Sequence, residues 1–337
     1  MSTAHTVTVH KRNTRGKDPL ISIVLIDWSV RERFHALDWL NAQDVPRDEY
    51  ELVWVELFDR VIPEVMEKAD AVLTCGQRGI YSKHQGWNIG NLHTRGQIVT
   101  NCDSDAVFPP DFIASIKRKF AGDRPDELNP LVLMHDEFRN NEVTYPDGIS
   151  TIEQVRAYHW MPLWKNFGAC MSFRRIDTIR FGGWDEHPRF LGFHAGADLP
   201  WRLINAGLPQ IWHDDSVALY HFAHPHPEAA YKLFSFDRKM WQELRAPTVH
   251  GAPMAAVESF ATGRILPLHE NPDIHATRLA LRRIDSEGET MIGNTPISIS
   301  GFTRKERLRL YLKFYRYKLA VSLKHSRWWP RRRRSAA

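Results

Sequence analysis

The sequence predicts an α/β fold: a Rossmann-like, mostly parallel sheet flanked by helices. Apolar, β-branched runs at 20–26 and 50–57, and a further expected strand at 97–105, alternate with helical spacing at 31–43 and 83–96. Continuous apolar runs of this length are typical of strands buried on both faces, and strand–helix alternation with short connections favours a parallel sheet. The 337 residues, 43% hydrophobic and 25% charged, have the composition of an ordinary soluble protein with a sizeable core.

The first strand–helix–strand unit shows each signal clearly. The run LISIVLI is bounded by polar residues and predicts a buried strand, and YELVWVEL predicts a second one. Between them, Phe34, Leu37 and Leu40 recur at helical spacing. The segment KHQGWNIGNLHTRG predicts a short helix that ends near Gly96 and leads into the strand QIVTNCDSD.

The rest of the chain is more mixed, and we divide it as follows. Residues 1–18 are expected to be a disordered arm, 19–235 one α/β domain, and the Pro- and Gly-rich residues 236–303 an extension that wraps the body. Within the domain the expected elements are a helix at 109–121, strands at 130–138, 167–175 and 216–228, and a glycine-rich loop leading into a short helix at 181–208.

The cysteines and the absence of apolar spans indicate a cytoplasmic chain. Three cysteines, Cys75, Cys102 and Cys170, are widely spaced and form no CxxC motif, which argues against a disulfide framework and a structural zinc site. The polar start has no apolar core of a signal peptide, and no run of 18 apolar residues predicts a transmembrane helix.

The last segment, residues 304–337, differs from the body in charge. It holds 13 Lys and Arg against one acid, Glu306, whereas residues 1–303 hold 32 basic and 39 acidic residues. An apolar stripe on an otherwise basic helix, closed by Trp-Trp-Pro-Arg-Arg-Arg-Arg, predicts peripheral attachment to an anionic membrane surface on the inner face of the cell membrane. Docking on a partner subunit is the alternative. The acidic body offers no basic face for nucleic acid, so that class of partner is not expected.

Two aspartates close the third strand. In IVTNCDSDAVFPPDF, Asp103 and Asp105 follow a buried run. Burying unpaired carboxylates is costly, and a divalent cation within reach of both would offset the repulsion between them. Ligands of open α/β sheets bind beyond the carboxyl ends of the strands, where these residues are expected. The alternative is a chance Asp-x-Asp in a solvated loop.

The order of these segments resembles family 2 glycosyltransferases of the GT-A fold over roughly residues 19–225. The resemblance rests on the opening strand and helix closed by Ala-Gln, the second strand ending in an acid, Asn-x-Gly before Arg-Gly and Asp-x-Asp, and FGGWDEHPRFLGF, which looks like the family's Gly-Gly-x-Asp-Glu acceptor loop. It implies a GT-A domain with a C-terminal amphipathic helical extension. It also implies a Mn²⁺ or Mg²⁺ cofactor that neutralises the leaving diphosphate of a nucleotide sugar.

The resemblance also implies site residues. Metal ligands would be Asp103, Asp105 and His221, with His224 in reserve. His221 could instead be a hydrogen-bonded core histidine, Glu56 a plain strand-end charge, and Lys83 and Asn88 helix caps. The nucleotide-sugar site would comprise Ile26, Asp27, Glu56, Lys83, Asn88, Asp103, Ser104 and Asp105.

The acceptor side departs from the family pattern. The acceptor loop would contribute Gly183, Trp184, Asp185 and Glu186, although Trp184 could equally be a core aromatic. Inverting members of the family carry a motif similar to Glu-Asp-x-x-Leu at this place. The corresponding segment of this chain, HAGADLPWRL, has one acid. Asp198 is the candidate catalytic base, and His194 and Asp185 are held in reserve. A retaining enzyme would need no such base.

The resemblance implies a non-processive, inverting transferase that moves one sugar, from a UDP-sugar by preference, to a hydroxyl of an acceptor. With the expected membrane attachment, that acceptor would be a glycan or lipid-linked sugar in surface polysaccharide or glycolipid synthesis. The Gln-x-x-Arg-Trp motif that is typical of the family's processive members is absent, since MWQEL does not match it. The alternatives are a catalytically silent binding module on the same fold and a nucleotidyltransferase. The segment LIDWSVRERF has no glycine for the phosphate loop of the latter.

Overall fold

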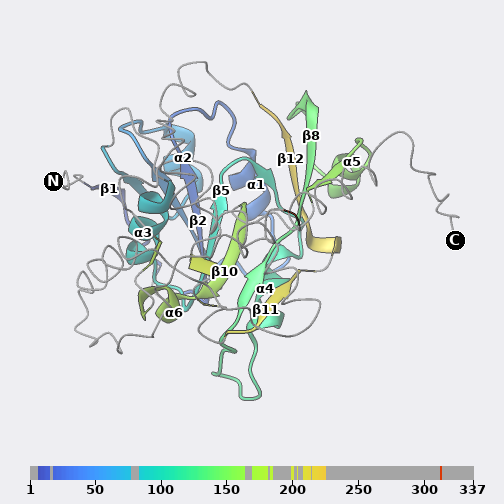
Figure 1. Cartoon of the computed structure of the whole chain (residues 1–337). Helices are drawn as coiled ribbons and strands as arrows, with labels where there is room; N and C mark the ends of the chain where they lie inside the picture. The colour runs from blue at the N-terminus through green and yellow to red at the C-terminus, as the bar shows by residue number, and fades with distance from the viewer. Residues whose placement is uncertain are drawn as a thin grey trace, which may run out of the picture.

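A mixed sheet of eight strands forms the centre of the computed structural model, which confirms the predicted α/β class (Figure 1). The structure describes residues 7–15, 18–76, 83–163, 169–180, 183–184, 199–200, 203, 208–213, 215–224 and 312. The strands in spatial order are β1 (Thr8–Lys11), β4 (Ala71–Thr74), β3 (Tyr50–Glu56), β2 (Ile21–Asp27), β5 (Ile98–Asp103), β10 (Cys170–Arg174), β7 (Val132–Met134) and β11 (Gln210–Trp212).

The four strands β4, β3, β2 and β5 are parallel, with β2 paired to both β3 and β5. All seven residues of β2 and of β3 are buried, which explains their continuous apolar runs. The chain order reverses between β2 and β5, because β3 and β4 lie on one side of β2 and β5 lies on the other. Crevices at such a reversal are the usual ligand sites of open α/β sheets.

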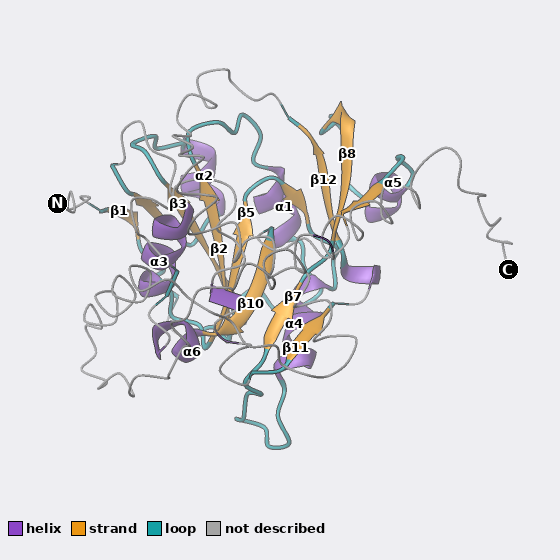
Figure 2. Ribbon diagram, viewed as in Figure 1, coloured by secondary structure: helices purple, strands orange, loops and turns teal. Residues whose placement is uncertain are grey.

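A second, four-stranded sheet lies beside the first and appears with it in orange in Figure 2. Its order is β6 (Ala106–Val107), β12 (Leu219–Ala223), β8 (Glu137–Thr144) and β9 (Met161–Leu163). The first of these strands begins directly after Asp105, so the Asp-x-Asp segment joins the two sheets. This connection places the late strand β12 against the end of β5.

Helices cover both faces of the large sheet. The side chains of α1 (His35–Asn41), α2 (Pro63–Lys68) and α4 (Phe112–Phe120) belong to one core cluster, and those of α3 (Lys83–His93) to the other. The approach of α3 is close, since a Cβ at Gly90 would lie 2.3 Å from Val24 Cγ1. The short elements are α5 (Ile152–Arg156), α6 (Arg175–Arg180) and a 3₁₀ turn at Asp215–Val217.

Two expected boundaries are wrong. The helix expected at 31–43 begins only at His35, so Arg31 lies in the loop after β2. The arm expected at 1–18 contains β1, which pairs antiparallel with β4. The Lys11 ammonium explains part of this order, because it donates to the carbonyl oxygens of Met66 (2.7 Å) and Ala69 (2.6 Å). The expected regions 236–303 and 304–337 lie outside the described residues, except for the exposed Leu312.

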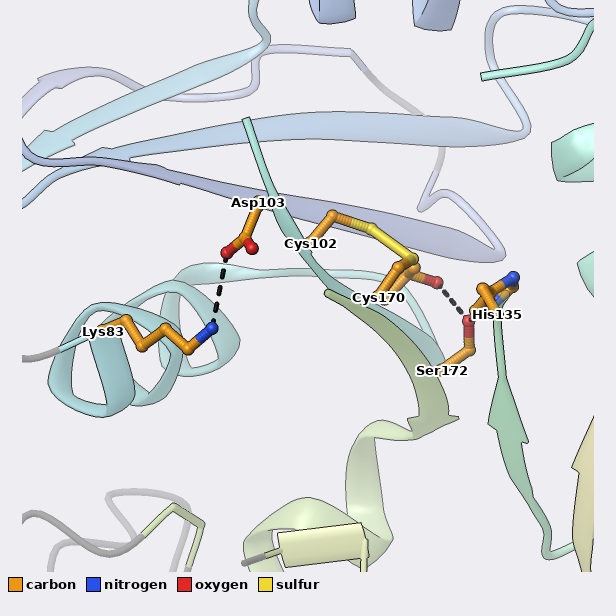
Figure 3. Close-up of a disulfide and its surroundings, with 7 residues drawn as sticks. Lys83, Cys102, Asp103, His135, Cys170 and Ser172 are labelled. Atoms are coloured by element: carbon orange, nitrogen blue, oxygen red, sulfur yellow. Dashed lines mark hydrogen bonds and ion pairs between the residues drawn. A yellow bond between two sulfur atoms is a disulfide. The ribbon is translucent and has the colours of Figure 1, made fainter. Parts of the chain in front are cut away.

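Two of the three cysteines are paired, which the sequence did not predict. Cys102 of β5 and Cys170 of β10 form a disulfide, shown in Figure 3 beside Asp103. The two residues are direct partners in the antiparallel register, which brings their Cα atoms to 4.3 Å. Cys75 is free and buried. The sequence spacing of 68 residues could not reveal this pairing because the register of β5 and β10 creates it.

None of the helices in the described part of the chain has the length and apolar character needed to cross a bilayer.

Candidate metal and nucleotide site

Carboxylates close three neighbouring strands of the parallel sheet. Asp27 ends β2, Glu56 ends β3 and Asp103 ends β5. The register aligns them, because Asp27 pairs with Glu56 and Ile26 pairs with Asp103. The sheet therefore brings its acidic residues to one edge, at the reversal of strand order, as the sequence predicted.

A cluster of possible metal ligands lies next to this edge. One ligand atom each from Asp105, His221 and His224 lies within 4.8 Å of the others. The Oδ2 atom of Asp105 is 3.3 Å from His221 Nε2 and 3.1 Å from His224 Nε2. Two imidazole nitrogens and one carboxylate oxygen that converge in this way form a plausible set for a divalent cation.

The pairing of β6 with β12 builds this cluster. His221 is the direct partner of Ala106, the residue after Asp105. This pairing holds the β12 backbone one residue from Asp105 along the chain, and the His221 Nε2 atom lies 3.3 Å from the Asp105 carboxylate. The short strand β6 thus explains how a histidine from the end of the domain reaches the Asp-x-Asp segment.

A buried carboxylate orients His221 from the other side. Glu137 of β8, 2% exposed, lies 2.6 Å from His221 Nδ1, and Arg139 Nε donates to the same oxygen at 2.7 Å. Burial alone would raise the pKa of Glu137, but the charges of His221 and Arg139 lower it to about 2. An ionised Glu137 can only accept a hydrogen bond, so Nδ1 carries the proton and Nε2 faces Asp105.

Asp105 is buried and lies against one arginine and two histidines. Burial would raise its pKa, but the positive charge of Arg31 and the two histidines holds the pKa of Asp105 well below its usual range. The guanidinium of Arg31 contacts Asp105 Oδ2 at 2.5 Å. The other oxygen, Oδ1, is buried with no hydrogen-bond partner among the described residues. An orphaned carboxylate oxygen beside two imidazoles fits a cation ligand.

Asp103 lies beside this cluster and faces Lys83 of α3 instead, as Figure 3 shows. The Lys83 Nζ atom is 3.6 Å from Asp103 Oδ1, and the Asp103 side chain is 27% exposed. Burial and the charge of Asp105 raise the pKa of Asp103, while Lys83 opposes that shift. Of the predicted metal ligands, the structure therefore brings together Asp105, His221 and the reserve His224.

The acids at the ends of β2 and β3 share a separate network. Asp27 accepts from Arg60 at 2.7 Å, and Glu56 accepts from the Ser29 hydroxyl at 2.7 Å and from the Phe58 amide at 3.0 Å. Burial and the nearby charge of Asp27 raise the pKa of Glu56 to about 7. A fully buried acid with this pKa is poised between accepting and donating hydrogen bonds near neutrality.

Asn88 and Trp184 are positioned by each other. The Asn88 amide donates to the Trp184 carbonyl at 2.9 Å and accepts from the Trp184 amide at 2.7 Å. The Trp184 ring is 0% exposed and packs against Trp87, with ring centroids 4.6 Å apart. This placement favours the core reading of Trp184 over stacking on an acceptor sugar. Gly183 has a φ of 66°, and a Cβ there would lie 2.5 Å from Asn88 Oδ1.

Several predicted residues lie elsewhere or outside the description. Ile26 is buried inside β2, and Ser104 is buried with a hydroxyl that has no partner among the described residues. The remaining acceptor residues and the candidate bases, Asp185, Glu186, His194 and Asp198, lie outside the described residues.

Sequence reasoning missed Arg31, Arg60 and Glu137. Arg31 was placed in a helix that begins later, and Glu137 was placed inside one strand at 130–138, where the structure has a break between β7 and β8. The acidic pair in the segment MHDEF, after an apolar run, was the available signal for Glu137.

A cavity of about 200 Å³ adjoins the metal cluster. The residues that line it include Arg31, His35, Asp105, Tyr145, Phe222 and His224. It lies between the loop that precedes α1 and the end of β12.

Comparisons with known proteins show similarity in structure alone. Neither a protein-family model nor a curated protein matches the sequence. S. aureus TarS with UDP-GlcNAc matches at a TM-score of 0.47 and 12% identity, over 70% of this chain and 66% of that one, so this chain spans slightly under two thirds of it. The mannosyltransferase PcManGT from Pyrobaculum calidifontis, with GDP-Man and Mn²⁺, matches at a TM-score of 0.41 and 16% sequence identity. That match covers 93% of this chain and 88% of PcManGT. GalNAc-T7 with UDP, GalNAc and Mn²⁺ matches at a TM-score of 0.48 and 13% sequence identity, and the match covers 79% of this chain and 55% of GalNAc-T7.

Proposed function

We propose that this protein is a metal-dependent glycosyltransferase of the family 2 type that transfers one sugar from a nucleotide diphosphate sugar to an acceptor hydroxyl. One observation supports it above the others. The ligand cluster of Asp105, His221 and His224 adjoins the sheet edge at which Asp27, Glu56 and Asp103 end their strands. A metal-ligand set next to polar strand ends suits a ligand with a nucleoside at one end and a diphosphate at the other.

Each group of residues has a part in that reaction. Asp105, His221 and His224 would hold the cation, which as a Lewis acid offsets the charge that develops on the leaving diphosphate. Asp27 and Glu56 would contact the nucleoside, and the Lys83 ammonium beside Asp103 would add positive charge near the phosphates. Asp198 would deprotonate the acceptor hydroxyl in an inverting reaction, with His194 or Asp185 as substitutes.

Mn²⁺ fits the ligand set better than Mg²⁺. Imidazole nitrogens suit first-row transition metals, whereas Mg²⁺ prefers oxygen ligands and bound water. The same combination of two histidines and one carboxylate also suits Fe²⁺. Metal analysis of the purified protein would distinguish Mn²⁺ from Fe²⁺. The acids at the ends of β2 and β3 favour a nucleotide-sugar reaction over the chemistry of an iron enzyme.

UDP-sugars are the favoured donors, and a glycan or lipid-linked hydroxyl in surface polysaccharide or glycolipid synthesis is the proposed acceptor. A catalytically silent binding module is the rival function, because Gly196 falls where the family's base usually stands and the candidate base Asp198 lies two positions later. A silent module would have no use for a metal that neutralises a leaving group.

The test is calorimetric titration of UDP and of GDP, each with and without Mn²⁺. Wild type is compared with Asp105→Asn, which keeps the shape of the side chain, and with Asp147→Asn, whose side chain is 89% exposed. We expect wild type to bind one of the two diphosphates only when Mn²⁺ is present. Asp105→Asn should lose this binding, and Asp147→Asn should keep it. Equal binding in the presence and absence of Mn²⁺, or none by folded protein, contradicts the proposal.

We also propose that residues 304–337 attach the protein to the cytoplasmic face of an anionic membrane. Their 13 basic residues against one acid and the apolar stripe support this proposal. Basic residues near an anionic surface each add on the order of 1 kcal/mol of binding free energy. Flotation with anionic vesicles is the test, and the full chain should float while a chain ending at residue 303 should not. Flotation of the shortened chain would contradict the attachment.

A further inference from the structure

An arginine occupies the candidate metal cluster. The Arg31 guanidinium places Nη2 2.5 Å from Asp105 Oδ2 and Nη1 3.0 Å from His224 Nε2. The Arg31 side chain is 11% exposed, so this contact is not a surface ion pair exchanged freely with water. The guanidinium therefore contacts two of the three groups that would hold the metal.

The arginine and a divalent ion cannot use these groups together. One oxygen, Asp105 Oδ2, lies within 3.3 Å of nitrogens from Arg31, His221 and His224. A cation held by the three side chains would need the His224 Nε2 atom, which Arg31 Nη1 contacts at 3.0 Å, at the shorter distance of a metal ligand. A cation on the unpartnered Oδ1 of Asp105 would still lie beside the guanidinium on Oδ2. Repulsion between the guanidinium and a doubly charged ion adds to the conflict, and it is strong where water is largely excluded.

The surroundings allow Arg31 to leave. It lies in the loop between β2 and α1, and its side chain is one wall of the cavity of about 200 Å³ next to Asp105. The buried Arg31 Nε atom has no partner among the described residues, so the contacts that hold the guanidinium are few apart from the metal ligands themselves. Withdrawal into the cavity would free Asp105 and His224 without moving a strand.

We propose that Arg31 is an internal cation that occupies the ligand set of the metal-free protein and is displaced by the divalent ion. This inference rests on the proposed metal site. Arg31 would compensate the buried charge of Asp105 when no metal is bound, and its displacement would lower the apparent affinity for the metal. Arg31 is thus a residue that sets metal affinity without being a metal ligand.

The opposite role for Arg31 gives opposite results. A guanidinium that permanently replaced the metal would itself bind the diphosphate. Removing it would then abolish diphosphate binding and would create no tighter metal site. The two roles are separated by measuring metal binding in the absence of nucleotide.

The experiment is titration of the full chain with Mn²⁺ alone, with free Mn²⁺ followed by electron paramagnetic resonance. Wild type is compared with Arg31→Gln, with Arg31→Lys and with Arg33→Gln. The last is a matched control, because Arg33 lies in the same loop but its side chain is 49% exposed and pairs with Asp147. Loss of one charge-assisted contact in a buried pair is expected to change affinity by about tenfold or more.

The expected result is that Arg31→Gln binds Mn²⁺ at least about tenfold more tightly than wild type, Arg31→Lys less so, and Arg33→Gln within about twofold of wild type. Equal or weaker binding by Arg31→Gln, with wild type binding Mn²⁺, overturns the inference and leaves the proposed function standing. No Mn²⁺ binding by any folded variant overturns both. An equal gain in Arg33→Gln overturns the displacement, because it would show a general effect of net charge.

Discussion

Asp105 and His221 face each other across two paired strands, with His221 Nε2 3.3 Å from Asp105 Oδ2. The relationship depends on backbone pairing, because His221 is the ladder partner of Ala106. Glu137 holds the far side of the imidazole at 2.6 Å. The candidate metal site is therefore built into the second sheet and not into a loop alone.

Replacing either histidine of the cluster should weaken Mn²⁺ binding. His221→Gln and His224→Gln each remove one nitrogen ligand, and each should raise the Kd for Mn²⁺ at least about tenfold, since outer contacts alone are worth that much. Calorimetry measures the Kd, and His159→Gln, at an exposed histidine, is the control. Unchanged affinity in His221→Gln would exclude it as a ligand.

Glu137 should act on the metal through His221. Glu137→Gln keeps the size of the side chain but removes the charge that fixes the imidazole, so Mn²⁺ affinity should fall about 10- to 100-fold. The matched control is Glu142→Gln, at an exposed position of the same strand β8. If both variants bind Mn²⁺ as wild type does, Glu137 does not position His221.

Glu56 should make stability depend on pH between its two pKa values. Its pKa is raised from 4.5 to about 7 by burial and by Asp27, so the folded protein holds a proton that the unfolded chain releases. Stability from this group is fully present below pH 4.5 and is lost as the pH rises through about 7, by on the order of 3 kcal/mol.

Urea unfolding of wild type and Glu56→Gln between pH 4 and pH 8 measures this effect. The free energy of unfolding of wild type should fall relative to that of Glu56→Gln over this window, whereas Glu64→Gln, with a side chain 45% exposed, should follow wild type. Parallel curves for wild type and Glu56→Gln would refute the raised pKa.

Trp184 should contribute to stability. Because its ring is fully buried against Trp87, Trp184→Ala should lower the free energy of unfolding by about 3–5 kcal/mol, and Trp184→Phe by less. Denaturant unfolding checks this, with Leu92→Ala, at a side chain 43% exposed, as the control. A stability loss in Trp184→Ala no larger than the control's would restore the acceptor-stacking interpretation.

The parts of the fold with strong local signals were predictable. The strands β2 and β3 are nearly continuous apolar runs, β5 begins with the apolar pair Ile98 and Val99, and an acid is the last residue of each strand. Strands of two or three residues, such as β6 and β11, carry no periodic signal, and their pairing depends on distant partners.

The same difference separates the site residues. Asp105 was evident from its place after a strand, and His221 followed from the resemblance. Arg31 and Glu137 were missed, because the first depends on where a helix begins and the second on the register of β8 with β12. Neither relationship is visible in a local window of sequence.

The pairing of β6 with β12 has a consequence for the order of assembly. Asp105 and His221 are 116 positions apart, so the ligand set closes only after most of the described domain has been synthesised. Contacts of such long range form late, because the loop entropy must be lost before the contact is gained. The β2–β3 and β2–β5 pairings need only the first 103 residues, so the ends of these strands, where we propose that the nucleoside binds, can form first. Metal binding at the proposed site would then report that the chain has folded as far as His224.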